Sequence, residues 1–149
     1  MRARLTDDMK TAMKSGDKER LSTIRLMQSS IKDLDIANRG QAKDAASETE
    51  LLTLFAKMVK QREESAKIYF EGGRPELADK EKAEIVVIQA YMPSQLSDDD
   101  AKAAIAKIIA DTGASGIKDM GKVMAELRAK FAGQMDFGKA SVTIKALLS

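Results

Sequence analysis

Glycine and proline are almost confined to a few short segments, and the long stretches between these segments repeat apolar residues at helical spacing. Only two prolines occur in the chain, and four of its nine glycines lie between Thr112 and Asp136. Because both residue types interrupt helices, the stretches without them can stay helical. Alanine, leucine, lysine and glutamate are abundant, and aromatic residues make up only 4%. The sequence therefore predicts an all-α protein with an aliphatic core.

The apolar spacing predicts seven helices, four followed by three. The first is expected over residues 2–14, the second from about 18 to 38, the third from Ser47 to Gly72, and the fourth from 75 to about 91. The fifth is expected over residues 98–111. The sixth contains Met120 to Phe131 and ends at Gly133, and the seventh begins at Asp136. The apolar positions assigned to these helices include Met9, Met13, the run Ile85 to Ile88, Met120, Phe131, Phe137 and Leu147.

Polar residues mark where several of these helices should begin. Asp17 follows Gly16 and is expected to cap the second helix, because a short carboxylate accepts hydrogen bonds from the first backbone amides. Ser47 and Glu50 have the spacing of a capping box. Ser97 precedes three aspartates; a hard cation could bind there, but a helix N-terminus explains the acidic run better.

The clearest break in the chain is the stretch around Pro93. Proline disfavours helix at the preceding residue, Met92, and the next helix signal comes only at Ser97. We therefore expect two helical subdomains, residues 1–93 and residues 94–149. The second is near the lower size limit for a self-sufficient hydrophobic core.

The absence of cysteine and histidine removes several function classes. It excludes disulfides, thiol nucleophiles, His-based acid–base catalysis and metal sites built on either residue. No carboxylate pair or Ser–Lys arrangement suggests an active site, so we expect no catalytic residues, no metal and no cofactor. The first residues have no apolar signal core, and the run Ile85 to Ile88 is far too short to span a membrane. These features lead us to expect a cytoplasmic protein.

The remaining candidate site is a glycine- and lysine-rich segment near the C-terminus. Lys118, Gly121 and Lys122 lie together, and Lys130 and Lys139 could extend them as a basic strip. Ammonium groups beside exposed backbone amides can hold phosphate. Such binding would be independent of base sequence and sensitive to salt.

A structural interpretation of the same segment stays open. Gly113, Gly116 and Gly133 are expected to end helices and turn the chain, with no role in binding. The segment has no P-loop ending, which favours this simpler interpretation. Farther upstream, Arg20, Arg25 and Lys32 lie off the apolar stripe and are expected to form a solvated face, with a binding face as the alternative.

Three segments resemble a known family. These are the opening from Leu5 to Arg25, the stretch from Tyr91 to Ser97, and the stretch from Thr112 to Met124. Together they make the chain similar to free-standing YqeY-like proteins of the GatB/YqeY family. The resemblance covers nearly the whole chain and implies an all-α fold of two subdomains.

The resemblance also implies kinship with the C-terminal tail of the B subunit of glutamine-dependent aspartyl/glutamyl-tRNA amidotransferase. In that enzyme the tail helps to hold the tRNA, and the chemistry takes place in other domains. The family is often described as having carbon–nitrogen ligase activity with glutamine as amido donor. Because this chain resembles only the non-catalytic tail, and because it lacks an evident active site, we do not expect it to perform that reaction alone.

Two functions follow from these observations. The first is an accessory protein that binds tRNA or another RNA and works with an amidotransferase or another translation-associated protein. The alternative is a helical protein–protein interaction module without a nucleic-acid role. The long second and third helices would offer it an extended surface, and the nine methionines suit adaptable contacts.

Overall fold

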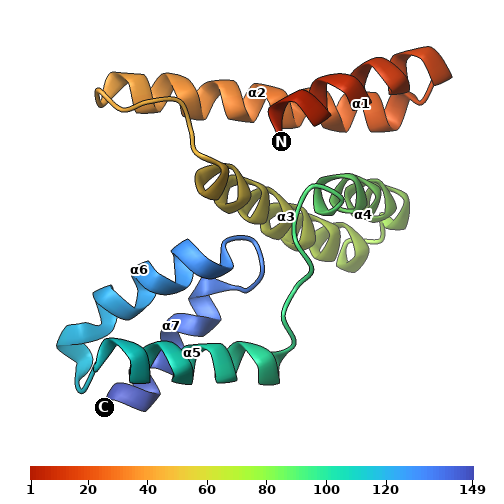
Figure 1. The fold of residues 1–149 in the computed structure, drawn as a ribbon. Coiled ribbons are helices and arrows are strands. Elements are labelled where there is room, and N and C mark those ends of the chain that lie inside the picture. Colours follow the sequence, from red (N-terminus) through yellow and green to blue (C-terminus); the bar gives the residue numbers. More distant parts are fainter. The chain divides into compact units, whose positions relative to one another are not determined.

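The structure is a computed structural model that describes residues 1–149 and contains only helices (Figure 1). The prediction of an all-α protein with seven helices is confirmed. The helices are α1 (Arg2–Ser15), α2 (Lys18–Gly40), α3 (Glu48–Glu71), α4 (Pro75–Gln89), α5 (Asp98–Thr112), α6 (Met120–Phe131) and α7 (Phe137–Leu148). A short 3₁₀ turn, η1 (Ile117–Asp119), precedes α6.

The chain divides into two compact units, Met1–Met92 and Pro93–Ser149. We call them the N-terminal unit and the C-terminal unit. Each has its own cluster of buried apolar side chains.

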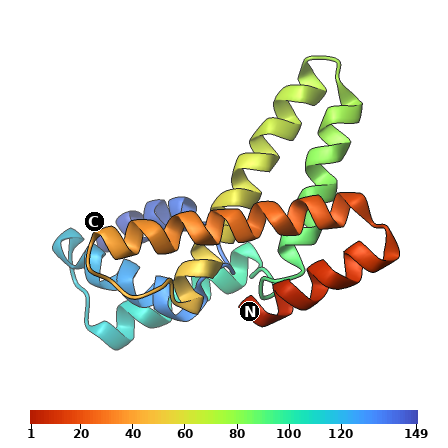
Figure 2. The same ribbon diagram turned by 90° about the horizontal axis from the view of Figure 1, so that it is seen from above.

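The N-terminal unit consists of two pairs of neighbouring helices. Helix α1 runs back along α2, and α3 and α4 form a hairpin, as Figure 2 shows from above. Aliphatic and methionine side chains fill the core, with Phe55 as its one fully buried phenylalanine. Helix α2 contributes Ile24, Met27 and Ile31 at spacings of three and four residues, so one stripe of this helix faces the core.

The predicted caps of the N-terminal unit are confirmed. Gly16 ends α1 with φ at 73°, and the carboxylate of Asp17 accepts a hydrogen bond from the Arg20 backbone amide at 3.1 Å. Ser47 and Glu50 form a complete capping box at the start of α3. These reciprocal bonds satisfy amides that the helix cannot pair internally.

Three apolar residues assigned to helix faces are exposed instead. Met13, Val86 and Leu147 have 52%, 68% and 55% of their surface accessible. Each lies one position from a buried residue of the same helix. Because successive side chains point about 100° apart around a helix, the neighbour of a buried residue can face solvent. Helix α4, for example, buries Ile85 and Ile88 but turns Val86 away from them.

The C-terminal unit is a three-helix arrangement of α5, α6 and α7. Its core gathers Ile105 and Ile108 of α5, Val123 and Leu127 of α6, and Ile144 of α7. Asp136 caps α7 by accepting hydrogen bonds from Gly138 and Lys139. This small core positions the glycine- and lysine-rich segment.

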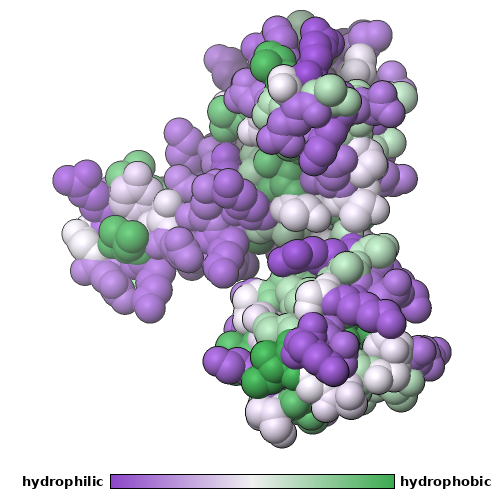
Figure 3. Space-filling model, turned by 90° about the vertical axis from the view of Figure 1, so that its left-hand side faces the viewer, coloured by the Kyte–Doolittle hydropathy of each residue, from purple (hydrophilic) through white to green (hydrophobic).

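The face of the molecule shown in Figure 3 is mainly hydrophilic. On the face shown in Figure 3, hydrophobic areas are scattered among hydrophilic side chains. None of the helices combines the length and the apolar character that crossing a bilayer requires.

Candidate functional site

The glycine- and lysine-rich segment forms a corner between α5 and α6. Gly113 ends α5 in a left-handed conformation, with φ at 68°. The chain then passes through the extended Gly116 and the turn η1 before α6 begins at Met120. This path places Lys118, Gly121 and Lys122 around the start of α6, and we call these three residues the lysine corner.

The two lysines of the corner have different surroundings. The Lys118 side chain is exposed and has no hydrogen bond or ion pair in the structure. The Lys122 ammonium donates to the backbone carbonyl of Thr112 at 3.4 Å. Because Thr112 is the last residue of α5, this contact places a positive charge at the negative end of a helix. Lys122 therefore has a structural role that the sequence did not reveal.

A carboxylate lies within the same corner. The Oδ2 of Asp119 accepts a hydrogen bond from the Ser115 backbone amide at 3.0 Å. The carboxylate thus occupies one amide of the loop and offsets part of the lysines' charge. The Asp119 side chain thus helps to order the loop, and Lys118 is the lysine of the corner whose ammonium group has no partner in the structure.

Gly121 does not require the special backbone freedom of glycine. It lies in the first turn of α6 without a positive φ, and a Cβ atom built there would meet nothing within 4 Å. An alanine would therefore fit the fold and favour the helix. The glycine leaves the backbone at the start of α6 bare, where a ligand can approach closely.

Lys130 and Lys139 lie apart from the lysine corner. Lys130 is in the last turn of α6, about 12 Å along the helix axis from Lys122, and it forms an exposed ion pair with Glu126 at 3.7 Å. Lys139 is in the first turn of α7. Gly133, with φ at 75°, turns the chain between them. The structure thus does not bring all four lysines into one compact group.

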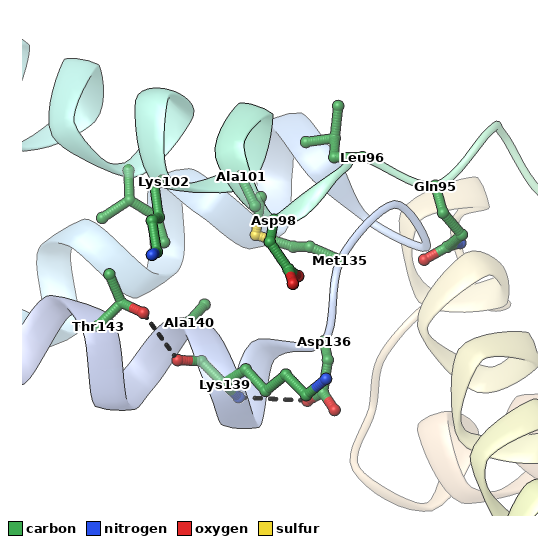
Figure 4. A pocket seen from close by; sticks show the side chains of 11 residues that line it. Gln95, Leu96, Asp98, Ala101, Lys102, Met135, Asp136, Lys139, Ala140 and Thr143 are labelled. Carbon is green, nitrogen blue, oxygen red and sulfur yellow. Dashed lines mark hydrogen bonds between the residues drawn. The ribbon is translucent and has the colours of Figure 1, made fainter.

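Lys139 instead lines a pocket between the first turns of α5 and α7 (Figure 4). The pocket measures about 390 Å³. In Figure 4, Asp98 and Lys102 project from α5 toward α7, and the Lys139 side chain runs toward Asp136. Two carboxylates and two ammonium groups give its rim no net charge, while Ile105, Met135 and Ala140 provide apolar lining.

Two hydrogen bonds hold one wall of this pocket. The Gln95 side-chain amide donates to the carbonyl of Gly133, and the Leu96 backbone amide donates to the carbonyl of Gln134 at 2.9 Å. The segment after Pro93 is thereby fixed to the loop between α6 and α7. Sequence reasoning missed Lys102 and Gln95, since no sequence signal pairs the start of α5 with the loop before α7.

The shifted pKa values all belong to groups of the N-terminal unit that have structural partners. Burial and a hydrogen bond to Asp8 raise the pKa of Tyr91 to about 12. The guanidinium of Arg2 and the Ala46 amide hold the pKa of Asp35 at about 2. The Asn38 amide is the main cause of the lowered pKa of Glu50. Each shift has a partner in the fold, so none marks an acid or base prepared for catalysis.

Other features of a reactive centre are also lacking. No group of three or more acidic, histidine or cysteine side chains is arranged to hold a metal ion. Every buried side-chain nitrogen and oxygen has a hydrogen-bond partner. The lysine corner offers charge and open backbone to a ligand.

Comparison with known proteins gives a match over almost the whole chain. The sequence model described as "Yqey-like protein" matches residues 2–148. The protein named "Altered inheritance of mitochondria protein 41, mitochondrial" from Eremothecium gossypii is 37% identical over 90 residues, which are 60% of this chain and 48% of that protein. The proteins of the same name from Vanderwaltozyma polyspora and Saccharomyces cerevisiae are 37% and 34% identical over 91 and 88 residues. These matches cover 60% and 59% of this chain and 47% and 46% of those proteins.

These relatives correct one expectation from the sequence. The prediction of a cytoplasmic location is wrong by this comparison, because the relatives are named as mitochondrial proteins and point to mitochondria instead. The absence of cysteine and the polar character of the first residues did not discriminate between these compartments. The chain matches about half the length of these relatives.

Proposed function

The chain belongs to the YqeY-like protein family, and from this membership we propose that it is an accessory protein that binds tRNA or another RNA. It contacts phosphate groups through the C-terminal unit and has no active site of its own. The observation that carries this proposal is the bare, exposed start of α6, where Lys118 and the unencumbered backbone of Gly121 lie within one helical turn. Ammonium groups and exposed amides are the usual protein partners of phosphate oxygens.

The similarity to the tail of the tRNA amidotransferase B subunit supports the same proposal, since that tail holds tRNA and leaves the chemistry to other domains. Lys130 and Lys139 would supply further contacts at the far end of α6 and the start of α7. Because these lysines are spread over the unit, each would touch a separate phosphate. The relation to an amidotransferase, or to another translation-associated protein, remains part of the proposal.

A titration with bulk tRNA tests the proposal. The double variant Lys118→Glu, Lys122→Gln removes two cations; the milder change at position 122 avoids placing a carboxylate against the Thr112 carbonyl. We expect its affinity to fall about tenfold near 0.1 M salt, and the slope of log K against log salt to shrink by roughly 1.5.

The matched control is Lys57→Glu, Lys67→Gln, which changes two exposed lysines of α3 by the same charge. It should bind tRNA like the wild type. Equal losses in both variants would mean that net charge alone governs binding, and absence of tRNA binding by the wild type at low salt would reject the proposal. Thermal unfolding of each variant verifies that the fold is retained.

A protein–protein interaction module is the second candidate function. Its support is the exposure of two apolar side chains near the end of α3, Ile68 and Phe70, each with 67% of its surface accessible. They lie about 200° apart around the helix, so each would form a separate contact. Apolar side chains exposed at the end of a hairpin suit contact with another protein. Ile68→Ser, Phe70→Ser would weaken that contact and leave tRNA binding unchanged, so the two functions are separable.

A further inference from the structure

The outer face of α2 carries a straight row of cations. Lys18, Arg25, Lys32 and Arg39 follow one another at intervals of seven residues, and all four side chains are exposed. We call these four residues the basic row. Ser22 and Ser29 lie between its members.

The helix geometry aligns these residues closely. Seven residues make two turns less about 20°, so successive members of the basic row drift only slightly around the helix. They rise by about 10 Å at each step and together extend over roughly 31 Å. Ile24 and Ile31, which face the core, each precede a member of the row by one position, or about 100° around the helix. The basic row therefore lies within the solvent face of α2, nearer to one of its edges than to its centre.

Three of the five acidic residues near the row have partners elsewhere in the fold, whereas Glu19 and Asp33 are exposed next to Lys18 and Lys32. Asp35 accepts two hydrogen bonds from the Arg2 guanidinium and one from the Ala46 amide. Asp17 caps the helix, and Asp8 is bonded to Tyr91. Arg39 lies in the field of Asp35, but Lys18, Arg25 and Lys32 have no ion-pair partner. The four cations of the row outnumber these two exposed carboxylates, so the row keeps a net positive charge.

The surface beside the row is hollowed. A groove of about 420 Å³ is lined by Lys18, Leu21, Ser22, Arg25 and Leu26. Short serine side chains lie between the first three cations, and the exposed Ile36 lies between Lys32 and Arg39. One backbone strand of a nucleic acid can therefore approach Lys18, Arg25 and Lys32 along α2.

We propose that the basic row binds the phosphodiester backbone of a nucleic-acid duplex, independently of base sequence. Regularly spaced cations over roughly 31 Å match a polymer that carries charge at short, regular intervals. A membrane surface fits less well, since a helix that lies on a bilayer must insert its apolar face, and the apolar face of α2 is buried in the core. This surface belongs to the N-terminal unit and does not involve the lysine corner.

The triple variant Lys18→Gln, Arg25→Gln, Lys32→Gln tests the proposal in the full chain. The probes are a 20-base-pair RNA duplex and a DNA duplex of the same sequence. We expect duplex affinity to fall at least about tenfold near 0.1 M salt, and the salt slope to shrink by roughly 2 to 3. Loss with either duplex supports the row, and a larger loss with RNA assigns RNA as its ligand.

The control Lys57→Gln, Lys67→Gln, Lys82→Gln removes three exposed lysines of α3 and α4 and should bind like the wild type. Equal losses in control and row variants, unchanged affinity of the row variant, or no duplex binding by the wild type would each overturn the proposal. So would a row variant that loses only binding to phosphatidylserine vesicles. The two proposals can fail separately. If only the Lys118, Lys122 variant loses tRNA binding, the duplex proposal for the basic row still stands. If only the row variant loses duplex binding, the proposed function still stands.

Discussion

The Nε of Arg62 on α3 donates to the Oε2 of Glu84 on α4 at 2.9 Å, and both side chains are more than four-fifths buried. A second guanidinium nitrogen of Arg62 donates to the Met58 carbonyl at 3.1 Å. The pair therefore joins the two helices of the hairpin through a largely dehydrated contact, where the loss of one partner leaves a charge without compensation.

Breaking this pair should destabilise the protein. We expect Arg62→Met or Glu84→Leu alone to lower the free energy of unfolding by about 2 kcal/mol, because each leaves a mostly buried charge unpaired. The double variant should lose less than the sum of the two, since it removes both charges. Urea denaturation of the four proteins measures the coupling, and strictly additive losses would show that the pair contributes nothing beyond its separate side chains.

Alkaline pH should affect stability through Tyr91. Its hydroxyl donates to Asp8, the Arg4 guanidinium lies 4.3 Å above its ring centre, and its pKa is raised to about 12. The folded state thus holds the phenolic proton more tightly than the unfolded state. This stabilisation is complete below pH 10 and is lost as the pH rises through 12.

Tyr91→Phe should remove that alkaline loss and cost about 1 kcal/mol at neutral pH through the missing hydrogen bond. Tyr69 is the only other tyrosine, so a near-ultraviolet absorbance titration can assign each ionisation. A late ionisation that survives in the Tyr91→Phe variant would contradict the assignment.

Acidic pH should affect stability through Asp35. Its pKa of about 2, compared with an ordinary 3.8, means that the folded state favours the charged carboxylate. The resulting stabilisation is present above pH 4 and is lost as the pH falls through 2. Asp35→Asn should therefore be less stable than the wild type at pH 7, and the difference should shrink toward pH 2. Thermal unfolding over this range measures it, with the exposed Asp33→Asn as the matched control on the same helix; a constant difference would exclude the ion pair as its source.

Gly121→Ala should separate folding from binding. The backbone at this position is ordinary and open, so alanine should stabilise α6 by up to about 1 kcal/mol. The added methyl group should weaken tRNA binding if the backbone there approaches phosphate. Gly113→Ala is the contrasting change, and it should destabilise by about 1 kcal/mol because φ is 68°. Calorimetry and the tRNA titration together test both statements, and unchanged tRNA affinity of Gly121→Ala would remove Gly121 from the binding surface.

Much of the fold could be predicted because its signals are local. The caps at Asp17 and Ser47 and the stripe of α2 depend on residues a few positions apart, and the sequence displays such spacings directly. Helix ends were harder to predict: α2 extends to Gly40 and α4 stops at Gln89, two residues from the expected positions in each case. Hydrophobicity alone could not distinguish Val86 from Ile85, because the difference arises from which face α4 presents to its neighbours.

The sites were harder to predict because they depend on distant pairs. Arg62 lies at helical spacing from the buried residues of α3, but its partner Glu84 lies 22 residues later on another helix. The contact of Lys122 with Thr112, and the meeting of Lys102 with Lys139 at one pocket, likewise require the folded unit. The sequence identified the lysines as candidates, and only the structure distinguished the exposed Lys118 from the bonded Lys122.

The bonds from Gln95 and Leu96 to the loop before α7 determine where a fragment of the C-terminal unit should begin. A truncated fragment that starts at Asp98 would discard the Ser97 cap together with both bonds, and its pocket would lose a wall. A fragment or graft that starts at Pro93 would retain all of them. In the sequence, the residues after Pro93 look like a linker between two units. In the structure, most of this segment is bonded to the C-terminal unit and is part of it.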